Sequence, residues 1–109
     1  MIHMREKHFT EIKDDVRIDY RFIIEKGKIK HFSINVSILK ENKSEDVFRV
    51  DTAHKGLHVQ KFWISPKPKY LESKRKEDYN SEFNHWRKEV KENFERWAKI
   101  YIKKKEGLE

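Results

Sequence analysis

The chain has 109 residues, with 26 Lys and Arg against 19 Asp and Glu and a formal net charge of +7. Its length predicts a single domain, 1–109, and a 36% hydrophobic content that includes three Trp, seven Phe and four Tyr argues against a disordered chain. Because the chain has no Cys, disulfides, thiolate nucleophiles and cysteine-rich zinc sites are excluded.

Two features predict where the protein works. No apolar run approaches the roughly 20 residues that cross a bilayer, and the first residues, MIHMREKHF, lack the apolar core of a signal peptide. We therefore expect a soluble, cytoplasmic protein that does not act at a membrane. The abundance of Lys, Glu and Ile, with two Pro and three Gly, is typical of a heat-adapted protein.

Residues 16–64 carry the pattern of an antiparallel sheet, whereas 1–15 form a weakly patterned N-terminal segment whose structure stays open. Apolar and polar residues alternate over 16–24 and again over 29–39, the period of strands with one buried face. Gly27 between them predicts a short hairpin loop with a glycine bulge. Two further strands over 47–52 and 57–64 complete an antiparallel meander of four to five strands.

A basic linker, 65–77, separates the sheet from a long helix. Pro66 and Pro68 end the sheet because neither can donate to a strand ladder. Large apolar residues then recur at spacings of three and four: Tyr79, Phe83, Trp86, Val90, Phe94, Trp97 and Tyr101. This stripe predicts an amphipathic helix, 78–105, with Asn80 or Ser81 as its cap. The fold class is therefore α+β, with the helix packed on one face of the sheet and the other face open.

Polar side chains of the alternating strands point to that open face. They are Arg17, Asp19, Arg21, His31, Ser33, Asn35, Ser37, Arg49 and Asp51. A solvated sheet face explains such residues without any function.

The densest group of chemically active residues lies in RVDTAHKGLHVQKFW, residues 49–63. We select as candidate catalytic residues Arg49, Asp51, His54 and His58. Imidazoles titrate near pH 6.5, so two of them can act as the base and the acid of metal-free RNA cleavage. Arg49 or Lys61 would hold the phosphate, and Asp51 would orient a histidine. We interpret the remaining histidines as solvated surface residues: His3, His8, His31 and His85.

Metal binding is an alternative use of Asp51, His54 and His58, which supply one oxygen and two nitrogens. Their spacing suits a helix better than a hairpin, so we expect neither a metal nor another cofactor.

The net positive charge favours nucleic acid as a partner. A basic run with an aromatic residue inside it could meet a phosphate backbone and stack a base. The candidate nucleic-acid-binding residues are Lys61, Lys67, Lys69, Tyr70, Lys74, Arg75 and Lys76. The alternative is that a Lys-rich linker only increases solubility.

The segment from Arg49 to Gly56, with His58 and Lys61 beyond it, resembles the R-x-D-[NT]-A-H segment of a small uncharacterised family of archaeal and bacterial proteins. It is similar, more loosely, to the TumE-like toxins of toxin-antitoxin systems. The resemblance covers residues 16–64. It implies an endoribonuclease with Arg49, Asp51, His54 and His58 in its site, RNA as substrate and an antitoxin-like protein as partner.

This chain departs from the toxins after His58, where Val59-Gln60-Lys61 replaces a second closely spaced histidine. The missing histidine affects the expected catalysis more than the expected fold. The alternative function is a non-enzymatic module that binds protein or nucleic acid through its open sheet face or an edge strand. The oligomeric state, a homodimer included, stays open.

Overall fold

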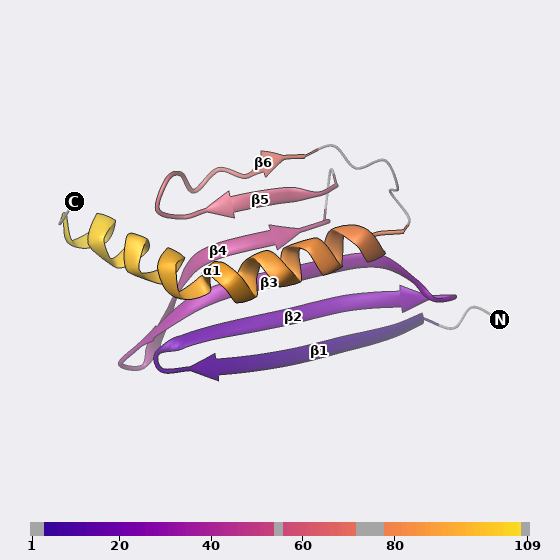
Figure 1. The fold of residues 1–109 in the computed structure, drawn as a ribbon, viewed down its shortest axis with the longest axis horizontal. Coiled ribbons are helices and arrows are strands. Elements are labelled where there is room, and N and C mark those ends of the chain that lie inside the picture. The colour runs from indigo at the N-terminus through magenta and orange to yellow at the C-terminus, as the bar shows by residue number, and fades with distance from the viewer. Residues whose placement is uncertain (1–3, 54–55, 72–77, 108–109) are drawn as a thin grey trace.

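The computed structural model describes residues 4–53, 56–71 and 78–107. It contains β1 (Met4–Lys13), β2 (Val16–Glu25), β3 (Lys28–Lys40), β4 (Lys43–Asp51), β5 (His58–Lys61), β6 (Lys69–Tyr70) and α1 (Asn80–Glu106). The strands lie side by side in chain order, and each pairs antiparallel with the next (Figure 1). The predicted α+β fold, an antiparallel meander with one long C-terminal helix, is confirmed.

The sheet has six strands rather than four or five, and it extends beyond 16–64 at both ends. β1 was not apparent from the sequence because all ten of its residues are exposed, so no buried face imposes an alternation. Backbone pairing with β2 holds it in place. β6 has two residues, within the predicted linker and directly after Pro68.

Tight turns join the first four strands. Lys26 and Gly27 have φ values of 51° and 75°, which match the twist of the flanking strands in a two-residue hairpin. The predicted glycine bulge is therefore absent from this turn. The register shifts instead between Ile23 and Ile24.

The apolar face of the sheet packs against α1. Ile18 and Tyr20 on β2 are each 3% exposed, and Val90 of the helix is fully buried. The Trp97 ring stacks on Phe48, with 4.3 Å between ring centroids. The aromatic stripe is therefore core, as the sequence predicts. The helix lies mainly over β3, with fewer contacts to β4 and β2, so β1 extends beyond its cover (Figure 1).

The start of α1 differs from the predicted cap. Tyr79 occupies the N-cap position without a side-chain hydrogen bond. Asn80 instead fixes the helix to the β2–β3 hairpin: its Oδ1 accepts from the Ile29 N–H at 2.8 Å, and its Nδ2 donates to the Gly27 carbonyl at 3.2 Å. At the other end Gly107 has a φ of 73°, and its N–H reaches the carbonyls of the last turn.

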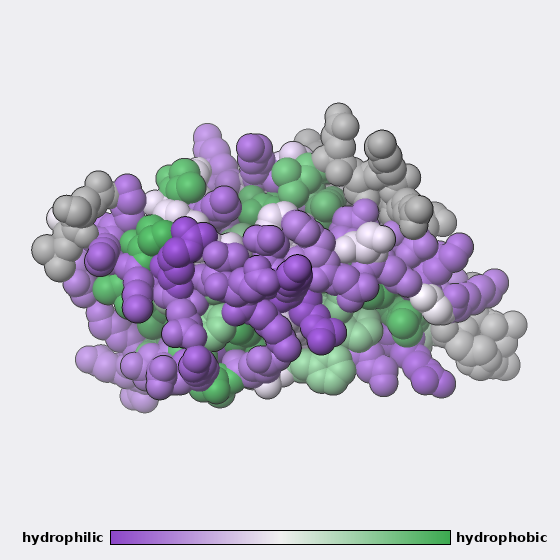
Figure 2. Space-filling view, in the orientation of Figure 1, coloured by the Kyte–Doolittle hydropathy of each residue, from purple (hydrophilic) through white to green (hydrophobic). Residues whose placement is uncertain are grey.

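The outward face of α1 is strongly hydrophilic (Figure 2). Within the described ranges, none of the helical sequence combines the length and the apolar character that a membrane crossing requires.

A polar cross-strand row as candidate functional site

One row of paired residues crosses all six strands on the face opposite the helix. Its members, in strand order, are His8, Arg21, Ser33, Asp51, His58 and Tyr70. Directly paired residues in antiparallel strands project their side chains to the same face, with Cα atoms about 4.5–5.5 Å apart. The row therefore places two imidazoles, a guanidinium, a hydroxyl, a carboxylate and a phenol in one line. We call it the polar row.

Asp51 stands at the end of β4, where the chain turns towards β5. Its Oδ1 accepts a hydrogen bond from the Ala53 N–H at 2.6 Å, the geometry by which an aspartate side chain initiates a turn. Gly56 closes the turn with a φ of 113°, which side-chain-bearing residues rarely adopt. Asp51 thus has a structural role that occupies one carboxylate oxygen.

Thr52 has a purely structural role in the same segment. Its hydroxyl accepts from the Phe32 N–H at 3.0 Å and donates to the Phe32 carbonyl at 3.3 Å. The residue is 3% exposed. The hydroxyl extends the β3–β4 pairing beyond the last strand residue and fixes the position of the turn.

His58 lies directly opposite Asp51, at the start of β5. Only 6% of the residue is exposed, although it lies on the helix-free face. Its Nδ1 is 2.9 Å from the Gly56 carbonyl oxygen, which can only accept, so Nδ1 carries a proton. In the neutral ring, Nε2 is therefore the nitrogen with a free lone pair. The Tyr70 ring lies 5.1 Å from the imidazole between centroids.

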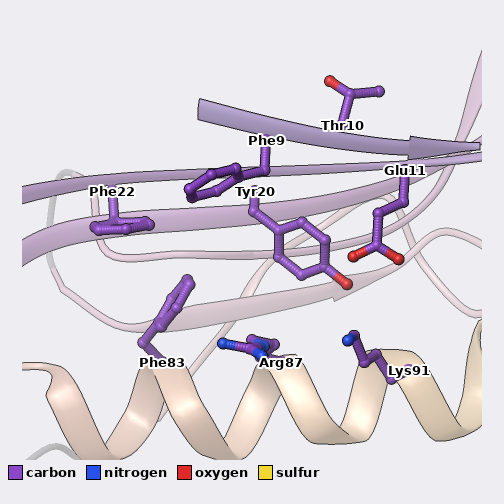
Figure 3. A pocket seen from close by; sticks show the side chains of 8 residues that line it. All are labelled: Phe9, Thr10, Glu11, Tyr20, Phe22, Phe83, Arg87 and Lys91. Atoms are coloured by element: carbon purple, nitrogen blue, oxygen red, sulfur yellow. The ribbon is translucent and has the colours of Figure 1, made fainter. Parts of the chain in front are cut away.

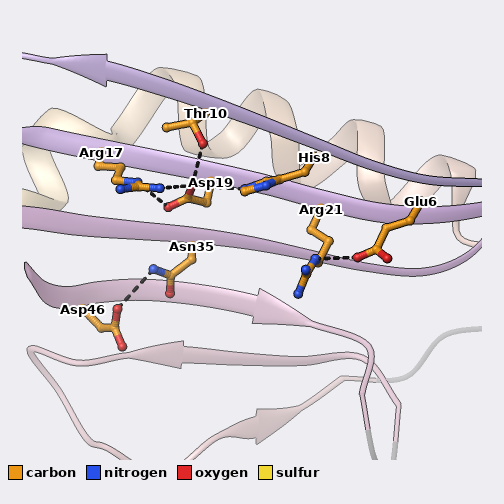
Figure 4. Close-up of polar contacts among 8 residues, drawn as sticks. All are labelled: Glu6, His8, Thr10, Arg17, Asp19, Arg21, Asn35 and Asp46. Carbon is orange, nitrogen blue, oxygen red and sulfur yellow. Dashed lines mark hydrogen bonds and ion pairs between the residues drawn. The ribbon is translucent and has the colours of Figure 1, made fainter.

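Arg49 occupies the neighbouring row of the same face and is engaged there. Its Nε donates to Asn35 Oδ1 at 3.1 Å, and its Nη2 lies 3.8 Å from Asp46. Asn35 also donates to Asp46, at 3.1 Å (Figure 4). Within the described part of the chain no hydrogen bond or ion pair joins Arg49 to Asp51 or His58. The structure thus brings Asp51 and His58 together and directs Arg49 elsewhere.

Asp19 is the centre of a second network on this face. Thr10, Arg17 and His8 all contact its carboxylate, at 2.7 Å, 2.9 Å and 3.3 Å (Figure 4). Burial alone would raise the pKa of Asp19, but the three hydrogen bonds together lower it from its ordinary value of 3.8. His8, the first member of the polar row, is held in place by this carboxylate.

Arg21 is the cation of the polar row. Its Nε lies 2.8 Å from Glu6 Oε1, and the two side chains are 63% and 54% exposed. So exposed an ion pair contributes about 0–1 kcal/mol, which makes the guanidinium readily available to a stronger anion. Arg21, His31, Ser33 and Asp51 also share the wall of a shallow hollow of about 200 Å³.

Those predicted basic residues that the structure describes do not gather at the polar row. Lys61 pairs with Phe48 and Lys69 with Val59, so the register directs both to the helix side of the sheet. Lys67 is exposed in the loop between β5 and β6, and its N–H donates to Ser65 Oγ. His54, Lys74, Arg75 and Lys76 lie outside the described residues. Of the predicted nucleic-acid-binding group, Tyr70 belongs to the polar row and is 46% exposed.

Sequence reasoning left out three members of the row. His8 falls in a segment with no predicted strand, so nothing indicated its direction. Arg21 and Ser33 were expected on the open face, but only the register between β2, β3 and β4 reveals that they lie in one row with Asp51, with Ser33 directly beside it. Among the described residues, no group of three His, Asp or Glu side chains could hold a metal ion.

Comparison with known proteins identifies a family for this chain. Searches of curated proteins and of solved structures found nothing that matches significantly. A family model described as "Domain of unknown function (DUF7718)" matches residues 4–107. Because this match covers all the described strands and the helix, the chain belongs to the DUF7718 family.

Proposed function

We propose that this protein binds single-stranded RNA along the polar row and cleaves it without a metal ion, as an endoribonuclease of the toxin type. The observation that carries the proposal is the row itself, in which Asp51 lies directly opposite His58. Tyr70 follows His58 in the row, and Ser33 and then Arg21 follow Asp51. Six strands spaced about 4.8 Å apart give it a length of about 24 Å, enough to contact more than one nucleotide.

His58 is the proposed base. Its Nδ1–H is committed to Gly56, which leaves the lone pair of Nε2 to accept a proton from a ribose 2′-hydroxyl. The 2′-oxygen then attacks the adjacent phosphorus as the bond to the 5′-oxygen breaks. A second, protonated imidazole returns a proton to that oxygen, and the products are a 2′,3′-cyclic phosphate and a 5′-hydroxyl. His54, which the sequence motif singles out, is the proposed acid.

Other members of the polar row supply the remaining requirements. Asp51 places a carboxylate on the residue directly opposite His58, where it offsets the positive charge that the imidazole gains as it takes the proton. Arg21 can exchange its exposed partner Glu6 for a phosphate, since guanidinium and phosphate form paired hydrogen bonds. Tyr70 offers an exposed ring on which a base can stack.

The test is cleavage of a short single-stranded RNA in EDTA by the purified protein and by two conservative variants. His58→Asn keeps an N–H donor near the Nδ1 position but has no counterpart of Nε2. Asp51→Asn keeps the oxygen that accepts from Ala53 but loses the charge. His85→Asn is the matched control, because His85 is exposed on the helix, away from the row.

We expect cleavage by the parent protein and by His85→Asn, with a cyclic phosphate product, and none of a DNA strand of the same sequence, which lacks the attacking hydroxyl. Cleavage by His58→Asn should be slower by about 10²–10⁴-fold. Binding of RNA without cleavage by any form would support the alternative, a nucleic-acid-binding module without enzymatic activity. Absence of both binding and cleavage at low salt would rule out the proposal.

A further inference from the structure

The opposite side of the sheet contains a hollow that the polar row does not explain. It lies between β1, β2 and α1 and has a volume of about 520 Å³. Three phenylalanine rings, Phe9, Phe22 and Phe83, line one end, and the charged groups of Glu11, Arg87 and Lys91 line the other (Figure 3). Hydrophobic side chains are visible between the helix and the β1 edge of the molecule (Figure 2). Its size falls within the usual range of small-molecule sites.

The hollow exists because the helix leaves β1 uncovered. Phe9 points from β1 to the helix side of the sheet, where it pairs with Tyr20, yet it is 54% exposed. The Phe9 and Phe83 rings flank that of Phe22, at centroid distances of 6.0 Å and 5.0 Å. Further along, Lys13 forms a 2.8 Å ion pair with Glu95 and joins the β1 end of the sheet to the helix. The three phenylalanine rings therefore border the hollow next to β1, which is fixed to the helix.

Tyr20 is the polar group that indicates a ligand. The residue is 3% exposed, and its hydroxyl has no hydrogen-bond partner. Figure 3 shows the hydroxyl directed towards the charged end of the hollow. Burial, followed by the charge of Glu11, raises the pKa of Tyr20 to about 12, so the phenol keeps its proton and is a donor. Buried donors are nearly always paired, so this hydroxyl is available to a ligand that brings an acceptor.

The charges beside this hydroxyl define the acceptor. Arg87 and Lys91 are four residues apart, on the same side of α1 as Phe83, and both are exposed. Within the described residues neither belongs to an ion pair. Glu11 offsets one of the two cations, so the charged end has one net positive charge. This balance suits a single negative charge better than a phosphate dianion or a neutral molecule.

We propose that this hollow, the β1–α1 pocket, binds a small organic monoanion: a carboxylate or sulfonate with an aromatic or branched apolar body. The apolar body would lie against the phenylalanine rings. The anionic group would accept from the Tyr20 hydroxyl and pair with Arg87 and Lys91. The ligand would bind on the side of the sheet opposite the polar row, so the two sites can be tested separately.

The experiment is a fluorescence titration of the full chain with 8-anilinonaphthalene-1-sulfonate, an aromatic monoanion. We expect saturable binding that 1-naphthoate displaces and the neutral 1-naphthalenemethanol does not. Amide chemical-shift mapping with 1-naphthoate should move signals of Phe9, Tyr20, Phe83 and Arg87. Absence of saturable binding, or shifts confined to other residues, would overturn the proposal.

Four variants distinguish this site from nonspecific dye binding. Arg87→Gln should raise the Kd about tenfold, because it removes a charge-assisted hydrogen bond. Glu11→Gln should lower the Kd, because it removes the opposing charge. Tyr20→Phe should weaken binding while leaving the fold intact or more stable, since it deletes an unpaired buried hydroxyl. Lys88→Gln, an exposed helix position outside the pocket, is the control and should bind as the parent does. Equal affinity of Arg87→Gln, Tyr20→Phe and the parent would overturn the assignment.

Discussion

Asp51 and His58 are directly opposed across β4 and β5, so the carboxylate that opens the turn and the imidazole that follows it lie on one face of the sheet. The imidazole is buried and its Nδ1 is fixed by the Gly56 carbonyl. Thr52 and one oxygen of Asp51 thus build the turn, and in the neutral His58 ring the lone pair is left on Nε2.

If His58 is the base, His58→Asn should lower the RNA cleavage rate about 10²–10⁴-fold, the usual contribution of general base catalysis. Asp51→Asn should lower it less, about tenfold, because only the charge next to the imidazole is lost. Rates measured under single-turnover conditions separate this effect from binding. Activity that survives unchanged in His58→Asn would assign the base to another residue.

Tyr70→Ala should weaken RNA binding about 5- to 150-fold, because stacking of one base on an aromatic ring is worth about 1–3 kcal/mol. Tyr70→Phe keeps the ring and should bind as tightly as the parent. Fluorescence anisotropy with a labelled 2′-O-methyl RNA, which cannot be cleaved through its 2′-oxygen, measures the two Kd values. Equal weakening by Phe and Ala would show that the hydroxyl, and not the ring, makes the contact.

Thr52→Val should lower the free energy of unfolding by about 1–3 kcal/mol, because it leaves the backbone N–H of Phe32 buried without its partner. Thr52→Ser retains a hydroxyl and should cost much less. Urea unfolding followed by tryptophan fluorescence gives both values. A Val variant as stable as the Ser variant would mean that the hydroxyl does not hold the turn.

Asp19 should make stability depend on pH at the acid end. The hydrogen bonds that it accepts lower its folded-state pKa, so its contribution is present above the ordinary value of 3.8 and is lost as the pH falls through the folded-state pKa. Asp19→Asn should therefore cost about 1 kcal/mol at pH 7 and progressively less below pH 4. The free energies of unfolding of the parent and of Asp19→Asn are measured between pH 7 and pH 2. A difference between them that stays constant down to pH 2 would contradict this prediction.

Much of the fold could be predicted because buried faces impose periods on the sequence. The alternation from Val16 to Ile24 and the stripe from Tyr79 to Tyr101 each record a face in contact with the core. β1 lacks such a face, and its sequence therefore left no strand pattern. The Asn80 side chain matched a helix cap in type, yet it bonds to a hairpin 51 residues away, a contact that local sequence does not encode.

The candidate site was predictable in part. The motif singled out Asp51 and His58 by density of polar groups, and the alternation placed Asp51 on the open face. Whether His58 shares that face depends on the turn between them, because a shift of one residue reverses the direction of every side chain in β5. Arg49 was selected with them, but its contacts with Asn35 and Asp46 follow from the pairing of β3 with β4.

RNA binding along the polar row is tested most directly by mapping the residues that single-stranded RNA contacts. We propose to titrate the isotope-labelled chain with a short 2′-O-methyl RNA and to record amide chemical shifts at low and moderate salt. We expect the largest changes at Arg21, Ser33, Asp51, His58 and Tyr70, small changes along α1, and an affinity that falls as salt rises. Changes centred on the outer face of α1 and absent from the polar row would contradict this expectation.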